Sequence, residues 1–305
     1  MFRSILVPLD QTRFAEAALP LASRLARNGG SRLHLVLSHQ LIPSVGGMGE
    51  VAFLPSGIED ELRDQERTYL RELAAEFVLN GLATVGYREV DGPAGEALCE
   101  EAARVEADLV VMATHARGAL GRLWHGSVAD HVVRHAGVPV LLIPPGAREG
   151  RRSPQLARGI LVALDLSSES QAILTPVAAL ARLTGAPLTL VHVVVDPILE
   201  MSRYPMPLGE SPSVEERSAE AERHLAAVAA GLRDQGLTVS VEVKQGIDPA
   251  WILGDALRVT DFDLLAMTTH GRGGLRRLWM GSVASKVLED ATKPLLLFRP
   301  HSNAA

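Results

Sequence analysis

Cysteine is nearly absent from this sequence, and long apolar runs are missing. Cys99 is the one cysteine among 305 residues, so no internal disulfide can form and a cytoplasmic protein is expected. No apolar stretch approaches the roughly 20 residues that a membrane-spanning helix needs. The run from Ile5 to Leu9 is cut by Asp10 and is too short for a signal peptide. We therefore expect no membrane association.

Positive charge is also in deficit. The chain has 30 Lys and Arg against 36 Asp and Glu, a net charge of −6. An acidic balance does not favour binding to nucleic acid or to anionic lipid. The sequence has no Gly-x4-Gly-Lys-(Ser/Thr) motif, which excludes a P-loop enzyme. Cys99 lies in the helical stretch Ala97-Leu98-Cys99-Glu100 and is expected to be a small, inert residue rather than a nucleophile.

An internal repeat organises the chain. Of the 32 residues in the window 114–145, 18 recur identically at a constant offset of 155 positions, in the window 269–300. The segment Ile5–Asp10 likewise returns as Ile160–Asp165 at the same offset. Units of this length can each bury their own core, so two self-standing domains are expected. We place the first copy at residues 1–145, a linker at 146–157 and the second copy at 158–300.

Each copy alternates predicted strands with predicted helices. In the first copy the strands are 5–8, 33–37, 84–90, 109–113 and 138–143, the helices are 12–28, 59–79, 95–105 and 127–135, and 40–57 is a long loop. In the second copy the strands are near 160–164, 188–194, 238–243, 264–268 and 295–298. This order predicts an α/β fold of two tandem doubly wound five-stranded parallel sheets, flavodoxin-like or Rossmann-like. The strand order is 3-2-1-4-5 or 2-1-3-4-5.

Two features at strand ends indicate a ligand site in each copy. Asp10 and Asp165 close the first strands, and a loop after each fourth strand leads through Gly-Ser into a helix. Glycine lets the backbone approach a ligand, and a helix N-terminus offers free N–H groups to an anion. Arginines in the loops add positive charge: Arg117, Arg122, Arg272, Arg276 and Arg277. The pattern favours a phosphate site in which the aspartate contacts a ribose hydroxyl or holds Mg²⁺.

Other interpretations of these residues stay open. Ser127 and Asp130 fit a capping box that needs no ligand. His131 and His135 are spaced as in metal sites, but Lys286 and Asp290 replace them in the second copy. The Thr-His pairs at 114–115 and 269–270 and the repeated Trp124 and Trp279 are expected to be local contacts and loop anchors rather than catalytic or stacking groups. The helix 59–76, rich in Glu and Arg, is expected to be a solvated face.

Taken together, these motifs resemble the universal stress protein family in its tandem form. The resemblance rests on strand-Asp, Met-x-Thr-His-x-Arg-Gly, Gly-Ser-Val-Ala and a final Pro-Val-Leu or Pro-Leu-Leu strand. Many members bind ATP through a Gly-x2-Gly-x9-Gly-(Ser/Thr) loop, and others bind none. The second copy has Thr268-x2-Gly271-x9-Gly281-Ser282, whereas the first has Ala113-x2-Ala116-x9-Gly126-Ser127. Because alanine adds a Cβ near the phosphate, the second copy is the better ATP candidate.

The resemblance implies a set of nucleotide-contacting residues and a mode of association. The implied residues are Asp165, Val193, Thr268, His270, Gly271, Arg272, Gly281, Ser282 and Val283 in the second copy, and Asp10, Ser38, Ala113, Ala116, Gly126, Ser127 and Val128 in the first. Asp165 and Asp10 are the candidate Mg²⁺ ligands. The apolar fifth strands would be bare edges unless they pair, with each other or with another chain as a homodimer.

Three functions are compatible with this pattern. The first is a stress-response regulatory protein that binds ATP, mainly in the second copy, and couples binding to partner or oligomer contacts. The second is an interaction protein with vestigial pockets. The third is a slow ATPase, for which the sequence offers no recognisable general base.

Overall fold

The computed structural model describes residues 2–40, 44–45, 51–52, 57–114, 127–144, 158–195, 212–259, 261–269 and 280–299. The chain divides into two compact units. One is formed by Phe2–Thr114 and His125–Val140, and the other is formed mainly by residues from 141 onward. Each unit is described by itself. The predicted linker, 146–157, lies outside the described residues.

The first unit contains a parallel sheet with helices between its strands. Its elements are β1 (Ser4–Leu9), η1 (Ala15–Ala18), α1 (Leu19–Gly29), β2 (Arg32–His39), β3 (Ser44–Val45), β4 (Val51–Ala52), α2 (Ile58–Leu79), β5 (Val85–Asp91), α3 (Ala94–Arg104), β6 (Leu109–Ala113) and α4 (Ser127–His135). The last strand of the first copy, β7 (Val140–Ile143), begins in this unit at Val140 and continues past its boundary. β1 pairs in parallel with both β2 and β6, and β2 pairs with β5. The Val110 amide of β6 donates to the carbonyl of Pro139, the residue before β7, at 3.0 Å. β7 therefore lies beside β6.

The second unit repeats this order. Its elements are β8 (Ile160–Ala163), α5 (Ser168–Gln171), α6 (Leu174–Thr184), β9 (Leu188–Val195), α8 (Val214–Arg233), β10 (Val239–Gly246), α9 (Pro249–Val259), β11 (Leu264–Thr268), α10 (Ser282–Glu289) and β12 (Leu295–Phe298). The strands lie in the order β10-β9-β8-β11-β12, and all are parallel. This is the order 3-2-1-4-5, so the doubly wound fold is confirmed and the alternative 2-1-3-4-5 is wrong.

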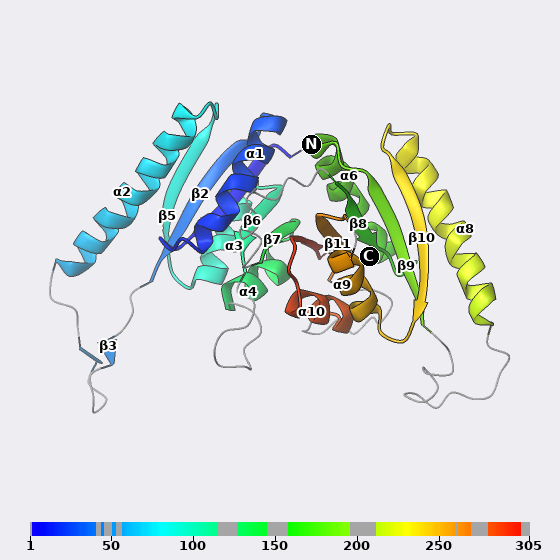
Figure 1. Cartoon of the computed structure of the whole chain (residues 1–305). Coiled ribbons are helices and arrows are strands. Elements are labelled where there is room, and N and C mark those ends of the chain that lie inside the picture. The colour runs from blue at the N-terminus through cyan, green and yellow to red at the C-terminus, as the bar shows by residue number, and fades with distance from the viewer. Residues whose placement is uncertain are drawn as a thin grey trace, which may run out of the picture. The chain divides into compact units, whose positions relative to one another are not determined.

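Burial of the strands explains their composition. All of β1, β7 and β11 is buried, as is almost all of β6. A parallel sheet covered on both faces needs near-continuous apolar strands, as the sequences of these strands indicate. The helices cover the sheets with their apolar sides; α2 lies along β5, and α8 lies along β10 (Figure 1). Leu70 and Ala74 of α2 are buried, as are Leu225 and Ala229 at the same places on α8.

Two predicted segments differ from the structure. The predicted helix 12–28 is a short 3₁₀ helix followed by α1, which starts at Leu19 with a proline in its first turn. Proline is well suited to a helix start because its missing N–H would be unpaired there. The predicted loop 40–57 contains two short antiparallel strands, β3 and β4. The other predicted elements that the structure describes agree with it to within about three residues at their ends.

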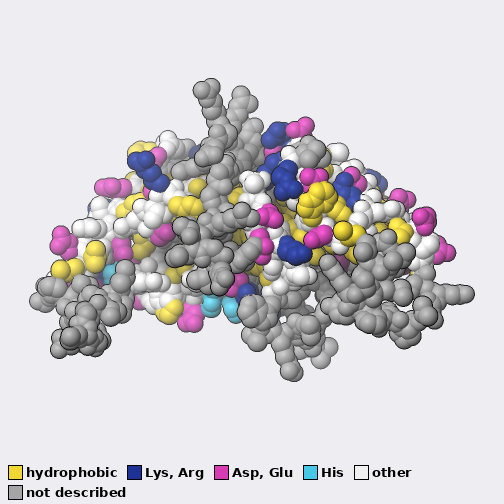
Figure 2. Space-filling view, turned by 60° about the horizontal axis from the view of Figure 1, so that its bottom comes forward, with side chains coloured by type: hydrophobic (Ala, Val, Ile, Leu, Met, Phe, Trp, Pro, Cys, Tyr) yellow, Lys and Arg dark blue, Asp and Glu magenta, His cyan; other side chains and the backbone are white. Residues whose placement is uncertain are grey.

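In the part of the chain that the structure describes, no helix is both long enough and apolar enough to cross a bilayer. On the face shown in Figure 2, Lys and Arg side chains of the described residues are interspersed with Asp and Glu.

A half-buried histidine on β2 distinguishes the first copy from the second. The Nε2 atom of His34 is buried and has no hydrogen-bond partner among the described residues. Burial is the main cause that lowers the pKa of His34, and the charge of Arg32 lowers it further; Glu101 opposes this, and Arg104 adds to it. The place of His34 is taken in the second copy by Thr189, which cannot titrate in this range.

His34→Thr is therefore expected to reduce the loss of stability in acid. Because the folded-state pKa lies below 6.5, the unfolded chain binds more protons, and the free energy of unfolding falls as the pH drops below about 6.5. Urea denaturation of both proteins between pH 8 and pH 5 measures the slope. The prediction is wrong if the His34→Thr protein loses as much stability as the parent over this interval.

Candidate functional site

The winding direction of the second unit reverses at β8. β8 pairs with β9 on one side and with β11 on the other, and Val162 lies opposite both Leu190 and Ala266. The carboxyl ends of these three strands therefore lie at the same edge of the sheet. In open α/β sheets, ligands bind at the strand carboxyl ends where the direction reverses. β1, between β2 and β6, is the corresponding strand of the first unit.

The aspartate that follows the central strand shapes a tight turn. Asp165 Oδ1 accepts hydrogen bonds from the amide of Ser167, at 3.0 Å, and from its hydroxyl. The Ser167 hydroxyl oxygen in turn accepts from the Ser170 amide and caps α5. Asp10 and Thr12 form the same turn in the first unit, with 2.9 Å between the Thr12 amide and Asp10 Oδ1. Both predicted aspartates thus have a structural role in the turn.

The residue after each aspartate has left-handed backbone geometry. Gln11 has φ 62° and Leu166 has φ 67°, although neither is glycine. For a residue with a Cβ, this conformation costs about 1–2 kcal/mol. Strained backbone of this kind clusters at ligand sites and switch regions. The same strain at the same edge of both units marks this turn as a place of functional interest.

Gln11→Gly is expected to be more stable than Gln11→Ala by about 1 kcal/mol, because glycine relieves the strain and alanine retains it. Gln11 is exposed, so both variants lose little side-chain packing. Urea denaturation gives the free energies of unfolding of the two variants, and their difference measures the strain. A glycine variant that is less stable than the alanine variant would contradict the assignment of strain.

A helix N-terminus lies at the end of β11. The Gly281 amide donates to the Thr269 carbonyl at 2.8 Å, and the Thr269 amide donates to Phe298 at 3.0 Å. Gly281 is the N-cap of α10, and no side-chain cap is present there. In contrast, Ser213 caps α8 with a full capping box. The first-turn amides of α10 therefore lie at the ligand edge without a side-chain acceptor at the N-cap, which suits an anionic ligand.

The capping-box interpretation of Ser127 and Asp130 is wrong. Ser127 is the first residue of α4 rather than its N-cap. The Asp130 carboxylate accepts instead from Arg134, at 2.7 Å and 2.9 Å. Asp130 is therefore held in an ion pair with a residue one helical turn away.

The remaining predicted site residues are only partly described. Val193 and Ser38 lie near the ends of β9 and β2, and the Ser38 hydroxyl donates to the Gly92 carbonyl at 3.0 Å. Thr268 and Ala113 are the last residues of β11 and β6, and Ser282, Val283 and Val128 lie in the first turns of α10 and α4. His270, Gly271, Arg272, Ala116 and Gly126 lie outside the described residues. Trp124, Trp279, His115 and the five loop arginines do so as well.

Two other candidates have local explanations. The rings of His131 and His135 lie 4.2 Å apart, and His135 Nδ1 is 2.9 Å from the His131 carbonyl oxygen. Burial, with a smaller effect of Glu100, raises the pKa of the Cys99 thiol to about 11. A thiol with such a pKa is a poor nucleophile at neutral pH.

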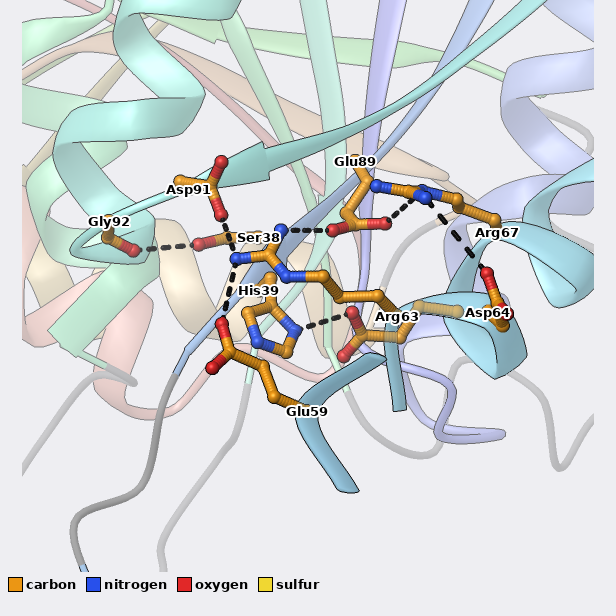
Figure 3. Close-up of polar contacts among 10 residues, drawn as sticks. Ser38, His39, Glu59, Arg63, Asp64, Arg67, Glu89, Asp91 and Gly92 are labelled. Atoms are coloured by element: carbon orange, nitrogen blue, oxygen red, sulfur yellow. Dashed lines mark hydrogen bonds and ion pairs between the residues drawn. The ribbon is translucent and has the colours of Figure 1, made fainter. Parts of the chain in front are cut away.

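The sequence predicted that the charged helix α2 is a solvated face. The structure shows that it also forms ion pairs with β5. Arg63 lies 2.6 Å from Glu89 and 2.7 Å from Asp91, both on β5 (Figure 3). Beside this ion pair, His39 Nδ1 at the end of β2 lies 2.7 Å from Glu66 Oε2 on α2. Sequence reasoning missed this cluster because its members are far apart along the chain. The available signal was the second copy, where Val194 and Ala221 stand in place of His39 and Glu66.

Comparison with known proteins identifies relatives of the whole chain. The model of the universal stress protein family matches residues 1–144 and again residues 157–299. A universal stress protein of Mycolicibacterium smegmatis is 27% identical over 307 residues, with 97% of each chain covered. One from Thermus aquaticus is 32% identical over 143 residues, which is 47% of this chain and 99% of that protein.

Solved structures agree on the fold. A universal stress protein of Archaeoglobus fulgidus covers 97% of this chain and 98% of its own, with a TM-score of 0.68 at 16% identity. One solved universal stress protein that matches 47% of this chain was crystallised in complex with cAMP, at 23% identity and a TM-score of 0.35.

Proposed function

This chain belongs to the universal stress protein family, and from that premise we propose that it is a stress-response regulatory protein that binds ATP, mainly in its second copy. Binding rather than turnover changes its contacts with a partner or with another subunit. Self-association through the apolar fifth strands, β7 and β12, is part of the same proposal.

The observation that carries this proposal is the position of the α10 N-terminus. The hydrogen bond from Gly281 to Thr269 holds it at the end of β11, and β11 is the neighbour of β8, which Asp165 follows. Main-chain amides at a helix N-terminus bind phosphate oxygens through directed hydrogen bonds and the helix dipole. Three or four such charge-assisted bonds at about 1.5–3 kcal/mol each supply the roughly 8 kcal/mol of micromolar binding.

The aspartate gives the site its preference for a nucleotide over free phosphate. A carboxylate repels bare phosphates, so Asp165 acts on a ribose hydroxyl or on a Mg²⁺ ion that accompanies the phosphates. In this arrangement the adenine lies against the backbone at the end of β9, near Val193. The same reasoning applies to Asp10 and Ser38 in the first copy, whose loop has the less favourable alanines.

Asp165→Asn is expected to weaken ATP binding about 10- to 100-fold, because a charge-assisted hydrogen bond or a metal ligand is lost. Asparagine retains a side-chain oxygen that can accept from Ser167, so the turn is kept. The matched control is Asp10→Asn, the same change in the first copy, which is expected to alter total binding little. Isothermal titration of the intact chain with ATP and Mg²⁺ measures both. If Asp165→Asn leaves the affinity for ATP unchanged, the proposed role of Asp165 is wrong.

Gly271→Ala gives the second copy the residue that the first copy has at Ala116, and is expected to weaken ATP binding at least tenfold. The added Cβ takes up the space in which the backbone approaches the phosphates. Ala116→Gly is the reciprocal variant and is expected to strengthen binding in the first copy. A parent chain that binds no ATP in this titration would instead favour an interaction protein with vestigial pockets.

A further inference from the structure

A second polar site lies in the first unit, where β2, β5 and α2 meet. His39 is the last residue of β2, Glu66 lies on α2 and Glu89 lies on β5. One ligand-type atom of each residue lies within 4.8 Å of the other two. His39 Nδ1 is 2.7 Å from Glu66 Oε2. An imidazole with two carboxylates is a donor set that binds divalent transition metals.

The imidazole of His39 is buried. Only 4% of this residue is exposed, and its Nε2 atom has no hydrogen-bond partner among the described residues. Nδ1 is the ring nitrogen that faces Glu66, so a metal shared with Glu66 would bind at Nδ1 in place of this hydrogen bond.

The second copy shows that the fold does not require these polar groups. Counted along β2 and α2, the counterparts of His39 and Glu66 are Val194, 2% exposed, and Ala221, fully buried. The pairing of the third strand shifts by one residue, since Val85 lies opposite Leu33 and Val239 lies opposite Leu188.

The counterpart of Glu89 in the sheet is therefore Val243, so all three counterparts are apolar. A polar trio at positions where the same fold accepts an apolar trio needs an explanation other than folding.

We propose that His39, Glu66 and Glu89 form a binding site for a divalent transition metal of the Zn²⁺ class. Imidazole nitrogen and carboxylate oxygen are ordinary Zn²⁺ ligands, and three protein ligands leave a fourth position for water or for a further ligand. Mg²⁺ prefers an all-oxygen, octahedral environment and is not expected to compete.

The arginines around the site support its carboxylates and do not fill it. Arg63 and Arg67 each contact one oxygen of Glu89, at 2.6 Å and 2.9 Å. A carboxylate has about four lone-pair positions, so it can accept from two arginines and still bind a cation. Hydrogen bonds of this kind commonly orient the ligands of a metal. The carboxylates paired with the two arginines outnumber them, and Glu66 beside His39 adds a further negative charge, so the site is net negative; the paired carboxylates are Glu59, Asp64, Glu89 and Asp91.

The test is a titration of the untagged, metal-stripped, full-length chain with ZnCl₂ in a calorimeter. We expect one site with micromolar affinity and at least tenfold weaker binding in the double variant His39→Val, Glu66→Ala. This variant carries the residues of the second copy, so it is expected to fold, which circular dichroism checks. Glu66→Gln is the second variant; it can still accept a hydrogen bond from His39 and is also expected to weaken Zn²⁺ binding at least tenfold.

His135→Asp is the matched control, since it removes one of two neighbouring histidines and again installs the residue of the second copy. It is expected to leave the affinity for Zn²⁺ unchanged. The proposal is overturned if the parent chain binds no Zn²⁺ below about 100 μM. It is overturned equally if the Glu66→Gln variant binds as tightly as the parent, or if only the His135→Asp variant loses binding. Addition of Mg²⁺ in place of Zn²⁺ is expected to give no heat of binding at this site.

Discussion

A parallel sheet that is buried on both faces can present polar groups to a ligand only where its strands end. In both units the central strands are apolar apart from Ser4 at the start of β1, and the first polar side chains of the chain after them are Asp10 and Asp165. This constraint places the candidate site before any functional residue is considered. It also fits the proposal that main-chain amides bind the ligand, because the turns that leave the strands lie at this edge.

The turn after the central strand combines a structural and a proposed binding role. Its carboxylate satisfies backbone and hydroxyl donors inside the turn, and the next residue keeps a left-handed backbone without being glycine. These local hydrogen bonds fix the direction of the carboxylate, so little ordering is left for a ligand to impose. A preformed carboxylate and a preformed helix N-terminus lower the entropic cost of binding. The strain in the turn is therefore consistent with a site prepared in advance, and both units share it.

Sequence reasoning succeeded where the signal is local. The strand 109–113 and the helix 127–135 were predicted with their observed bounds, since an uninterrupted apolar run and a clear helical period define them. It failed at Thr12–Phe14, where a turn in which the Asp10 carboxylate accepts from the Thr12 amide replaces the first turn of the expected helix. It failed again on α2, because the partner of Arg63 is Glu89, 26 residues away on another element. Helical periodicity shows which face a residue occupies but not which strand covers that face.

The duplication separates what the fold requires from what one copy adds. The aspartate turn and the helix after the fourth strand occur in both copies, so they belong to the fold that the copies share. The cluster around His39 occurs in the first copy alone, at the end of the strand that also carries Ser38. Divergence at this point means that the two copies do not have the same chemistry beside their predicted adenine positions. A metal held there would tie the end of β2 to α2 and β5, so it would act on the copy whose loop is less suited to ATP. The two proposed sites thus assign the copies different ligands, and a chain of two such copies can respond to two chemical signals.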